Sequence, residues 1–80
     1  MENEHVNHPD HYQTETGLEV IDIIEAVTFD LTGVEAFDIG NAIKYISRFT
    51  KKNGVEDLKK AAWYINHAIK HIENLEKENE

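Results

Sequence analysis

Two cationic side chains one helical turn apart, Lys44 and Arg48, could together bind a phosphate-type anion. At ~100° per residue of an α-helix they fall on one side with Asn41, and the isoleucines of this stretch fall on the other. Lys52 extends the cationic side past the helix end. Six of the eight Lys and Arg residues lie between positions 44 and 60, although the formal net charge of the chain is −8. The pattern predicts an anion site, with a solvated basic face as the alternative.

Trp63 and a group of N-terminal residues could complete such a site. By helical geometry Trp63 lies among cations on the polar side of its helix, where it could stack on a base or contact a second subunit. His8, His11 and Tyr12 surround Pro9, the only proline, in a stretch with a turn-like pattern. We expect this stretch to close over the ligand, and a disordered arm is the alternative.

Two pairs of carboxylates make Mg²⁺ an alternative ligand. Glu19 and Asp22, and likewise Glu35 and Asp38, lie three residues apart, so each pair shares a helical face. Hard cations need several carboxylate oxygens, and all-helical nucleotide pyrophosphohydrolases hold Mg²⁺ with paired motifs of this kind. Capping boxes explain both glutamates without a metal. We therefore predict no metal site and no cofactor, and Mg²⁺ would arrive only with a bound nucleotide.

The composition narrows the class of protein and its partners. Eighty residues make one small domain, and a chain of this size buries only ~60% of its unfolded surface, which favours oligomerisation. The absence of Cys excludes disulfides and thiolate chemistry and favours a cytoplasmic protein. No apolar run approaches the ~20 residues of a membrane span, so we expect no membrane partner. A net charge of −8 disfavours binding to duplex nucleic acid, whereas small anions respond to the local field.

Three capping-box patterns mark three helix starts. A Thr or Asn three residues before a Glu recurs at 16–19, 32–35 and 53–56. Hydrophobic periodicity between these patterns predicts an all-α fold, a small three-helix domain with an irregular N-terminal arm. The expected segments are the arm 1–15, helices over 17–31, 33–50 and 54–76, and an acidic tail 77–80.

The third predicted helix has the most regular apolar stripe in the sequence, and we expect this stripe to form the core. Its members are Leu58, Ala61, Ala62, Ile65, Ala68, Ile69 and Ile72. Trp63, His67 and Lys70 lie on the opposite side of this helix. Ile21 and Phe29 lie off the stripe of the first helix, so apolar surface is left for a partner. We therefore predict a homo-oligomer.

Four motifs in this order resemble a known family. They lie at 7–12 (NHPDHY), 17–22 (GLEVID), 40–48 (GNAIKYISR) and 56–64 (EDLKKAAWY). Over about residues 6 to 72 the chain resembles a small phage-encoded family of unknown function catalogued under nucleotide kinases, a label that comes from larger members with additional sequence. The resemblance implies a location in the host cytoplasm. It also implies that seven residues of this chain are positions of the family's motifs: His8, His11, Tyr12, Asn41, Lys44, Arg48 and Trp63.

Together these features predict a protein that binds a nucleotide or nucleotide-derived phosphate ligand and sequesters it, for example a host immune signal. Lys44 and Arg48 would contact the phosphate. Asn41 would hydrogen-bond to the sugar or the base, and Trp63 would stack on the base. One alternative is phosphoryl transfer to a nucleoside monophosphate, which is less favoured because the Gly-x-x-x-x-Gly-Lys-Ser/Thr loop is absent. Another is an acidic inhibitor that binds a host nucleic-acid-binding protein. We assign no catalytic residue.

Overall fold

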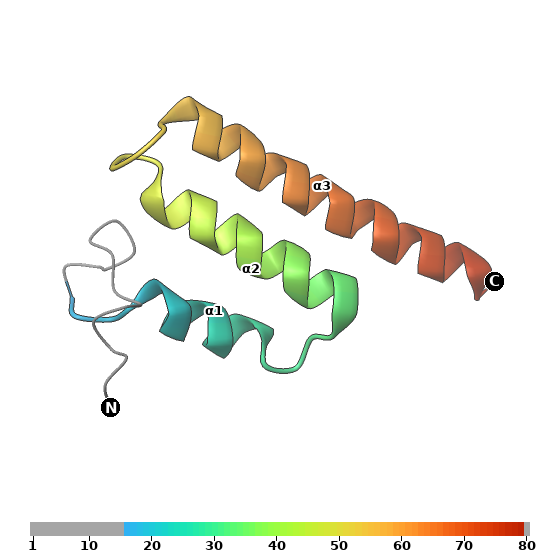
Figure 1. Ribbon diagram of the computed structural model, residues 1–80. Coiled ribbons are helices and arrows are strands. Elements are labelled where there is room, and N and C mark those ends of the chain that lie inside the picture. The colour runs from blue at the N-terminus through green and yellow to red at the C-terminus, as the bar shows by residue number, and fades with distance from the viewer. Residues whose placement is uncertain (1–15, 80) are drawn as a thin grey trace.

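The computed structural model describes residues 16–79, which form three α-helices (Figure 1): α1 (Val20–Thr28), α2 (Gly33–Arg48) and α3 (Val55–Glu78). The predicted all-α, three-helix fold is confirmed for this part of the chain. The starts of α2 and α3 lie within one residue of the predicted positions, whereas α1 is shorter at both ends than the predicted helix. α3 continues into the predicted acidic tail and ends at Glu78, halfway through it. The predicted N-terminal arm lies outside the described residues.

The cap of α1 explains its later start. Glu19, not Thr16, is the extended residue that precedes the helix, and its backbone N–H donates to the Asp22 carboxylate at 3.2 Å. This bond satisfies a backbone donor at the helix start, and the Asp22 charge lies at the positive end of the helix dipole. The capping box is therefore formed by Glu19 and Asp22, three residues later than predicted.

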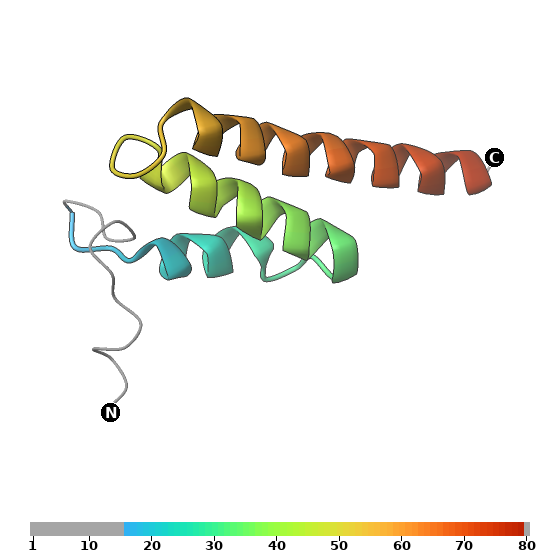
Figure 2. The same cartoon turned by 45° about the horizontal axis from the view of Figure 1, so that its top comes forward.

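The three helices form a single layer rather than a closed bundle. α1 and α3 lie on opposite sides of α2 in both views, and each packs on α2 (Figures 1 and 2). α1 comes close to α2 at Gly40, where a Cβ atom added to the glycine would lie 3.4 Å from Ile24 Cγ2. With α2 in the centre, each outer helix packs mainly on α2.

Because the helices form a single layer, the buried apolar core is small. Its fully buried members are Val20, Ala42, Ala61 and Ala68. The larger side chains of the stripe expected to form the core of α3 remain 38–46% exposed, and these are Leu58, Ile65, Ile69 and Ile72. The expectation of a fully buried stripe is thus wrong for its large members, because a single neighbouring helix covers only a narrow strip of α3. That strip carries small alanines, which let α2 and α3 approach closely.

No helix within residues 16–79 combines the length and the apolar character needed to cross a bilayer.

Candidate ligand-binding site

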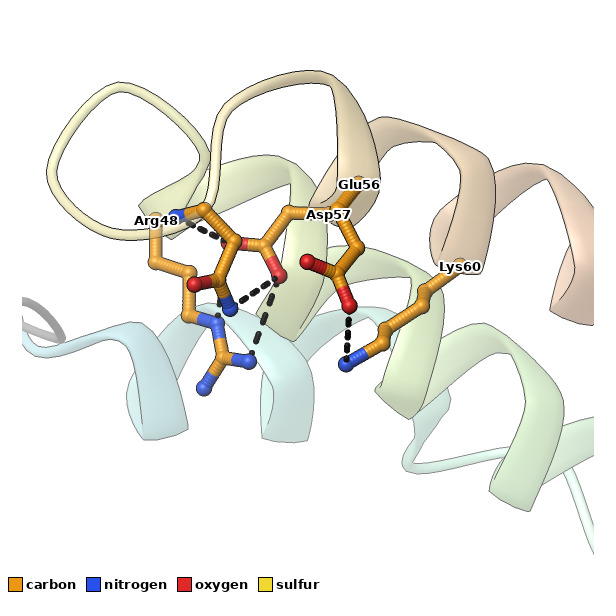
Figure 3. A network of polar contacts seen from close by, with 5 residues as sticks. Arg48, Glu56, Asp57 and Lys60 are labelled. Atoms are coloured by element: carbon orange, nitrogen blue, oxygen red, sulfur yellow. Dashed lines mark hydrogen bonds and ion pairs between the residues drawn. The ribbon is translucent and has the colours of Figure 1, made fainter.

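Arg48 lies in the interior and not on the exposed cationic side expected from helical geometry. Its side chain is 9% exposed, and Nε and Nη2 donate to the two carboxylate oxygens of Asp57, each at 3.2 Å (Figure 3). Asp57 lies in the first turn of α3 and is fully buried. The expectation that Arg48 is a surface residue is therefore wrong. Its long side chain reaches from the last turn of α2 to a carboxylate supplied by the next helix.

The same carboxylate fixes the connection between α2 and α3. The backbone N–H of Asn53 and its Nδ2 donate to Asp57 at 3.2 and 3.3 Å. Asn53 thus bonds to Asp57 and not to Glu56 as the sequence pattern predicted, and the N-cap residue of α3 is Gly54, with no side-chain cap bond in the described part of the chain. Burial alone would raise the pKa of the Asp57 carboxyl, but hydrogen bonds from Arg48 and Asn53 and the Arg48 charge outweigh it. The pKa of Asp57 consequently lies below its ordinary value of 3.8.

This lowered pKa predicts a pH dependence of stability. In the folded protein Asp57 binds its proton only below its ordinary range, so its contribution to the free energy of unfolding is complete above pH ~4 and is lost as the pH falls through the folded-state pKa. Urea unfolding of the parent and of Asp57→Asn at fixed protein concentration measures this. The parent should be more stable at neutral pH, and the gap should narrow in acid. A gap that stays constant with pH would contradict the assignment.

An aromatic and cationic surface spans one side of α2 and α3. We call it the aromatic–cationic face, and it consists of Phe37, Asn41, Lys44, Tyr45, Lys60, Trp63, Tyr64 and His67. Tyr45 of α2 and Tyr64 of α3 lie nearly parallel at its centre, with ring centroids 5.9 Å apart and an interplanar angle of 10°. Three cations lie within cation–π distance of the Tyr45 ring: Lys44 Nζ at 4.9 Å and Lys60 Nζ at 5.4 Å from its centroid, and the guanidinium carbon of Arg48 at 4.7 Å, although Arg48 is itself buried and paired with Asp57.

A cavity of about 290 Å³ opens on this face, lined by Tyr45, Lys60, Trp63 and Tyr64. Its volume lies at the lower end of the range for small-molecule sites, ~300–1,000 Å³. Trp63 is 58% exposed and stands edge-on to Tyr64, with centroids 5.0 Å apart at 83°. An exposed indole beside a cavity with aromatic walls offers a planar ligand a stacking surface.

The two lysines differ from Arg48 in how far their charge is neutralised. Arg48 is held bidentately by a buried carboxylate. Lys60 lies 3.8 Å from Glu56 in an i,i+4 pair whose side chains are 42% and 67% exposed (Figure 3), and pairs of this kind interact weakly. Lys44 forms no ion pair within residues 16–79. The charges of Lys44 and Lys60 are therefore the ones that an anionic ligand could use.

The residues predicted to form the site are only partly brought together. Lys44, Asn41 and Trp63 lie on the aromatic–cationic face, and the Asn41 amide donates to the Phe37 carbonyl at 2.9 Å. Lys52 is exposed in the connection between α2 and α3, and none of the contacts of this face described above involves it. The predicted site residues His8, His11 and Tyr12 lie outside the described part of the chain.

Five members of the face were missed because each helix was considered separately: Phe37, Tyr45, Lys60, Tyr64 and His67. Tyr45 directly follows Lys44, and Lys60, Tyr64 and His67 lie within one helical turn of Trp63. The members on one helix could have been grouped from the sequence, since residues three and four apart share a helical face. The contact between Tyr45 and Tyr64 joins two helices, so it could not be read from the periodicity of either one.

Three of the four paired carboxylates considered for Mg²⁺ have protein partners within residues 16–79. Glu19 and Asp22 cap α1. Asp38 is fully buried between α2 and α3, where its Oδ2 lies 2.7 Å from His67 Nδ1. Within residues 16–79, no group of three or more His, Asp or Glu side chains has an arrangement that could hold a metal ion.

Comparisons with known proteins place the chain in a family. Neither the curated proteins nor the solved structures gave a match. A family model described as a protein of unknown function, DUF3310, matches residues 6–66. This range includes α1, α2 and the aromatic–cationic face as far as Tyr64, and ends one position before His67. With most of its length matched, the chain belongs to the DUF3310 family of proteins of unknown function.

Proposed function

We propose that this protein binds a nucleotide-class ligand, an anion with a planar ring, at the aromatic–cationic face and holds it unchanged. The observation that carries the proposal is the cavity between Tyr45, Trp63 and Tyr64, with Lys60 in its wall. Stacking of a base on an aromatic side chain contributes ~1–3 kcal/mol and tolerates any base. Lysine ammonium groups form charge-assisted hydrogen bonds with phosphate. The face supplies both kinds of partner within one small area.

The charge distribution favours a compact anion over a polymer. The chain carries a net charge of −8, so the field of the whole molecule repels an extended polyanion. Lys44 and Lys60 both lie within 5.4 Å of the Tyr45 ring centroid, which concentrates positive charge where the cavity opens. A ligand with one to three phosphates can use this local charge without facing the acidic remainder of the surface.

We propose capture rather than phosphoryl transfer as the activity. Transfer needs groups that neutralise the moving phosphoryl group and hold its metal, and the sequence contains neither common phosphate-binding loop. The resemblance to phage-encoded sequences suggests that the captured molecule is a host nucleotide. Nucleoside monophosphate kinase activity is the alternative for the same surface, because both activities begin with nucleotide binding.

Ligand identification tests this proposal. We expect mass spectrometry of the natively purified protein to detect a nucleotide-class molecule. In calorimetric titrations against mono-, di- and cyclic nucleotides, with and without Mg²⁺, one class should bind and be recovered intact. A new phosphorylated species formed with ATP would establish the kinase alternative instead. Failure of every nucleotide both to co-purify and to bind would refute the proposal.

We also propose that a second copy of the chain covers the opposite side of α3. Large apolar side chains there are 38–46% exposed, and these are Leu58, Ile65, Ile69, Ile72 and Leu75. The spacing alternates between four and three residues, as in the seam between paired helices, at positions 58, 62, 65, 69 and 72. α3 has 24 residues and is ~36 Å long, and a self-complementary stripe of this length suits a symmetric dimer. Ile65 and Ile69 point roughly 120–160° away from Trp63, so the dimer would leave the cavity open.

Light scattering measures the predicted assembly. The parent should have at least twice the chain mass of 9.2 kDa, because an apolar stripe of this length is rarely left in water. Ile69→Lys places a charge in the seam and should shift the mass toward the monomer, whereas Lys70→Ala, on the neighbouring residue, should not. A parent that stays monomeric at high micromolar concentration would contradict this assembly.

A further inference from the structure

A buried carboxylate lies behind the aromatic–cationic face and has no direct part in the proposed capture of a nucleotide. Asp38 is fully buried in the α2–α3 interface. Its Oδ2 contacts His67 Nδ1 at 2.7 Å, and its Oδ1 is buried without a hydrogen-bond partner within residues 16–79. Burying a carboxylate that is only half satisfied opposes folding. The pair is therefore better explained by what Asp38 does to His67 than by stability.

Asp38 and Trp63 together fix the position of the His67 ring. The carboxylate accepts a hydrogen bond from Nδ1–H, which assigns the proton of the neutral ring to Nδ1 and leaves Nε2 as the atom for another partner. Trp63 stacks on the ring with centroids 5.0 Å apart and an interplanar angle of 11°. The side chain remains 46% exposed. One edge and one face of the imidazole are thus held, and the ring is still accessible to a ligand.

His67 lies next to the proposed site. It follows Trp63, which lines the cavity, by one helical turn on the same side of α3. Asp38 on α2 is paired with His67, and Lys70 and His71 lie three and four positions further along α3. Of these, Asp38 is the one in direct contact. A phosphate group beside Nε2 would complete a line of carboxylate, imidazolium and phosphate, in which the ring donates from both nitrogens.

We propose that His67 is a ligand-binding residue that donates from Nε2 to a phosphate group of the nucleotide-class ligand, with Asp38 as its positioning residue. This inference rests on the proposed function and adds a phosphate-binding group from α3 to Lys44 and Lys60. In the complex Nε2–H donates to the phosphate while Nδ1–H donates to Asp38, so the ring links the carboxylate to the ligand.

Side-chain ¹H–¹⁵N NMR of the parent protein tests the inference directly. In the free protein the His67 Nδ1 signal should be that of a protonated nitrogen bonded to Asp38. Saturating pyrophosphate or nucleoside monophosphate should shift the His67 Nε2 signal, because Nε2–H then donates to phosphate. His71, one turn further along α3, is the internal control and should not change. Spectra of His67→Gln and His71→Gln assign the two signals.

Binding measurements separate this inference from the proposed function. His67→Gln should weaken nucleotide binding by roughly tenfold, the loss of one charge-assisted hydrogen bond. Asp38→Asn should reduce the preference for the Nδ1–H tautomer in the free protein. If nucleotides bind the parent while the His67 signals stay unchanged, this inference is overturned and the proposed function stands. If pyrophosphate shifts the His67 signals and no nucleotide binds, the phosphate site stands and the nucleotide proposal fails.

Discussion

Arg48→Ala should lower the free energy of unfolding by about 3–5 kcal/mol, the usual cost of removing one partner from a buried ion pair. The variant would leave the buried Asp57 carboxylate without the guanidinium that contacts both of its oxygens. Small domains have total stabilities of about 5 kcal/mol or little more, so much of this variant should be unfolded at room temperature. Urea unfolding followed by circular dichroism measures the loss.

Two further variants make this result specific to the buried pair. Arg48→Lys keeps the charge but cannot bond both carboxylate oxygens in the same way, so its loss should be intermediate. Lys52→Ala removes a cation that is exposed in the adjoining connection and should change stability by no more than about 0.5 kcal/mol. If Arg48→Ala is as stable as Lys52→Ala, Arg48 is a surface residue in solution, and the prediction from the sequence that it binds phosphate would apply again.

Lys60→Ala and Lys44→Ala should each weaken nucleotide binding by roughly tenfold to a hundredfold. Each removes one charge-assisted contact with phosphate, which contributes ~1.5–3 kcal/mol. Folding should be preserved, because the pairing of Lys60 with Glu56 is solvent-exposed and exposed pairs contribute little. The two effects should not add independently, since both ammonium groups lie beside the same Tyr45 ring. Calorimetric titration with the ligand found by mass spectrometry measures both losses.

Lys77→Ala is the matched control for these variants. It removes an exposed cation in the last turn of α3, far along the helix from the cavity. We expect its affinity for the nucleotide to equal that of the parent. If the double variant Lys44→Ala, Lys60→Ala also binds like the parent, the cationic side of α2 and α3 is only a solvated surface.

The sequence was sufficient to predict the three helices because their signals are local. Apolar periodicity acts within one helix, and α2 and α3 begin within one residue of the predicted positions, although neither helix start has, within residues 16–79, the side-chain cap bond that the capping-box patterns predicted. The α1 start was missed by a few residues, because Glu19 and Asp22 form the capping box instead of Thr16 and Glu19.

Arg48 shows why the site could be predicted only in part. Helical geometry gives the direction in which a residue leaves the helix but not the reach of its side chain. The partner of Arg48, Asp57, belongs to the next helix, and only the packing of α2 on α3 brings the two together. The same packing joins Tyr45 with Tyr64 and Asp38 with His67. Lys44 and Trp63, whose exposure depends on their own helices, were identified from the sequence.

The fluorescence of Trp63 tests the central claim most directly. It is the only tryptophan in the chain, and it lines the cavity proposed to hold the base. Titration with the nucleotide, corrected for ligand absorption with free tryptophan, should quench the emission to saturation. Lys60→Ala should shift the midpoint to roughly tenfold higher concentration or more, and the midpoint for Lys77→Ala should stay in place. Emission that is unchanged while calorimetry shows nucleotide binding would place the ligand elsewhere and contradict the aromatic–cationic face as its site.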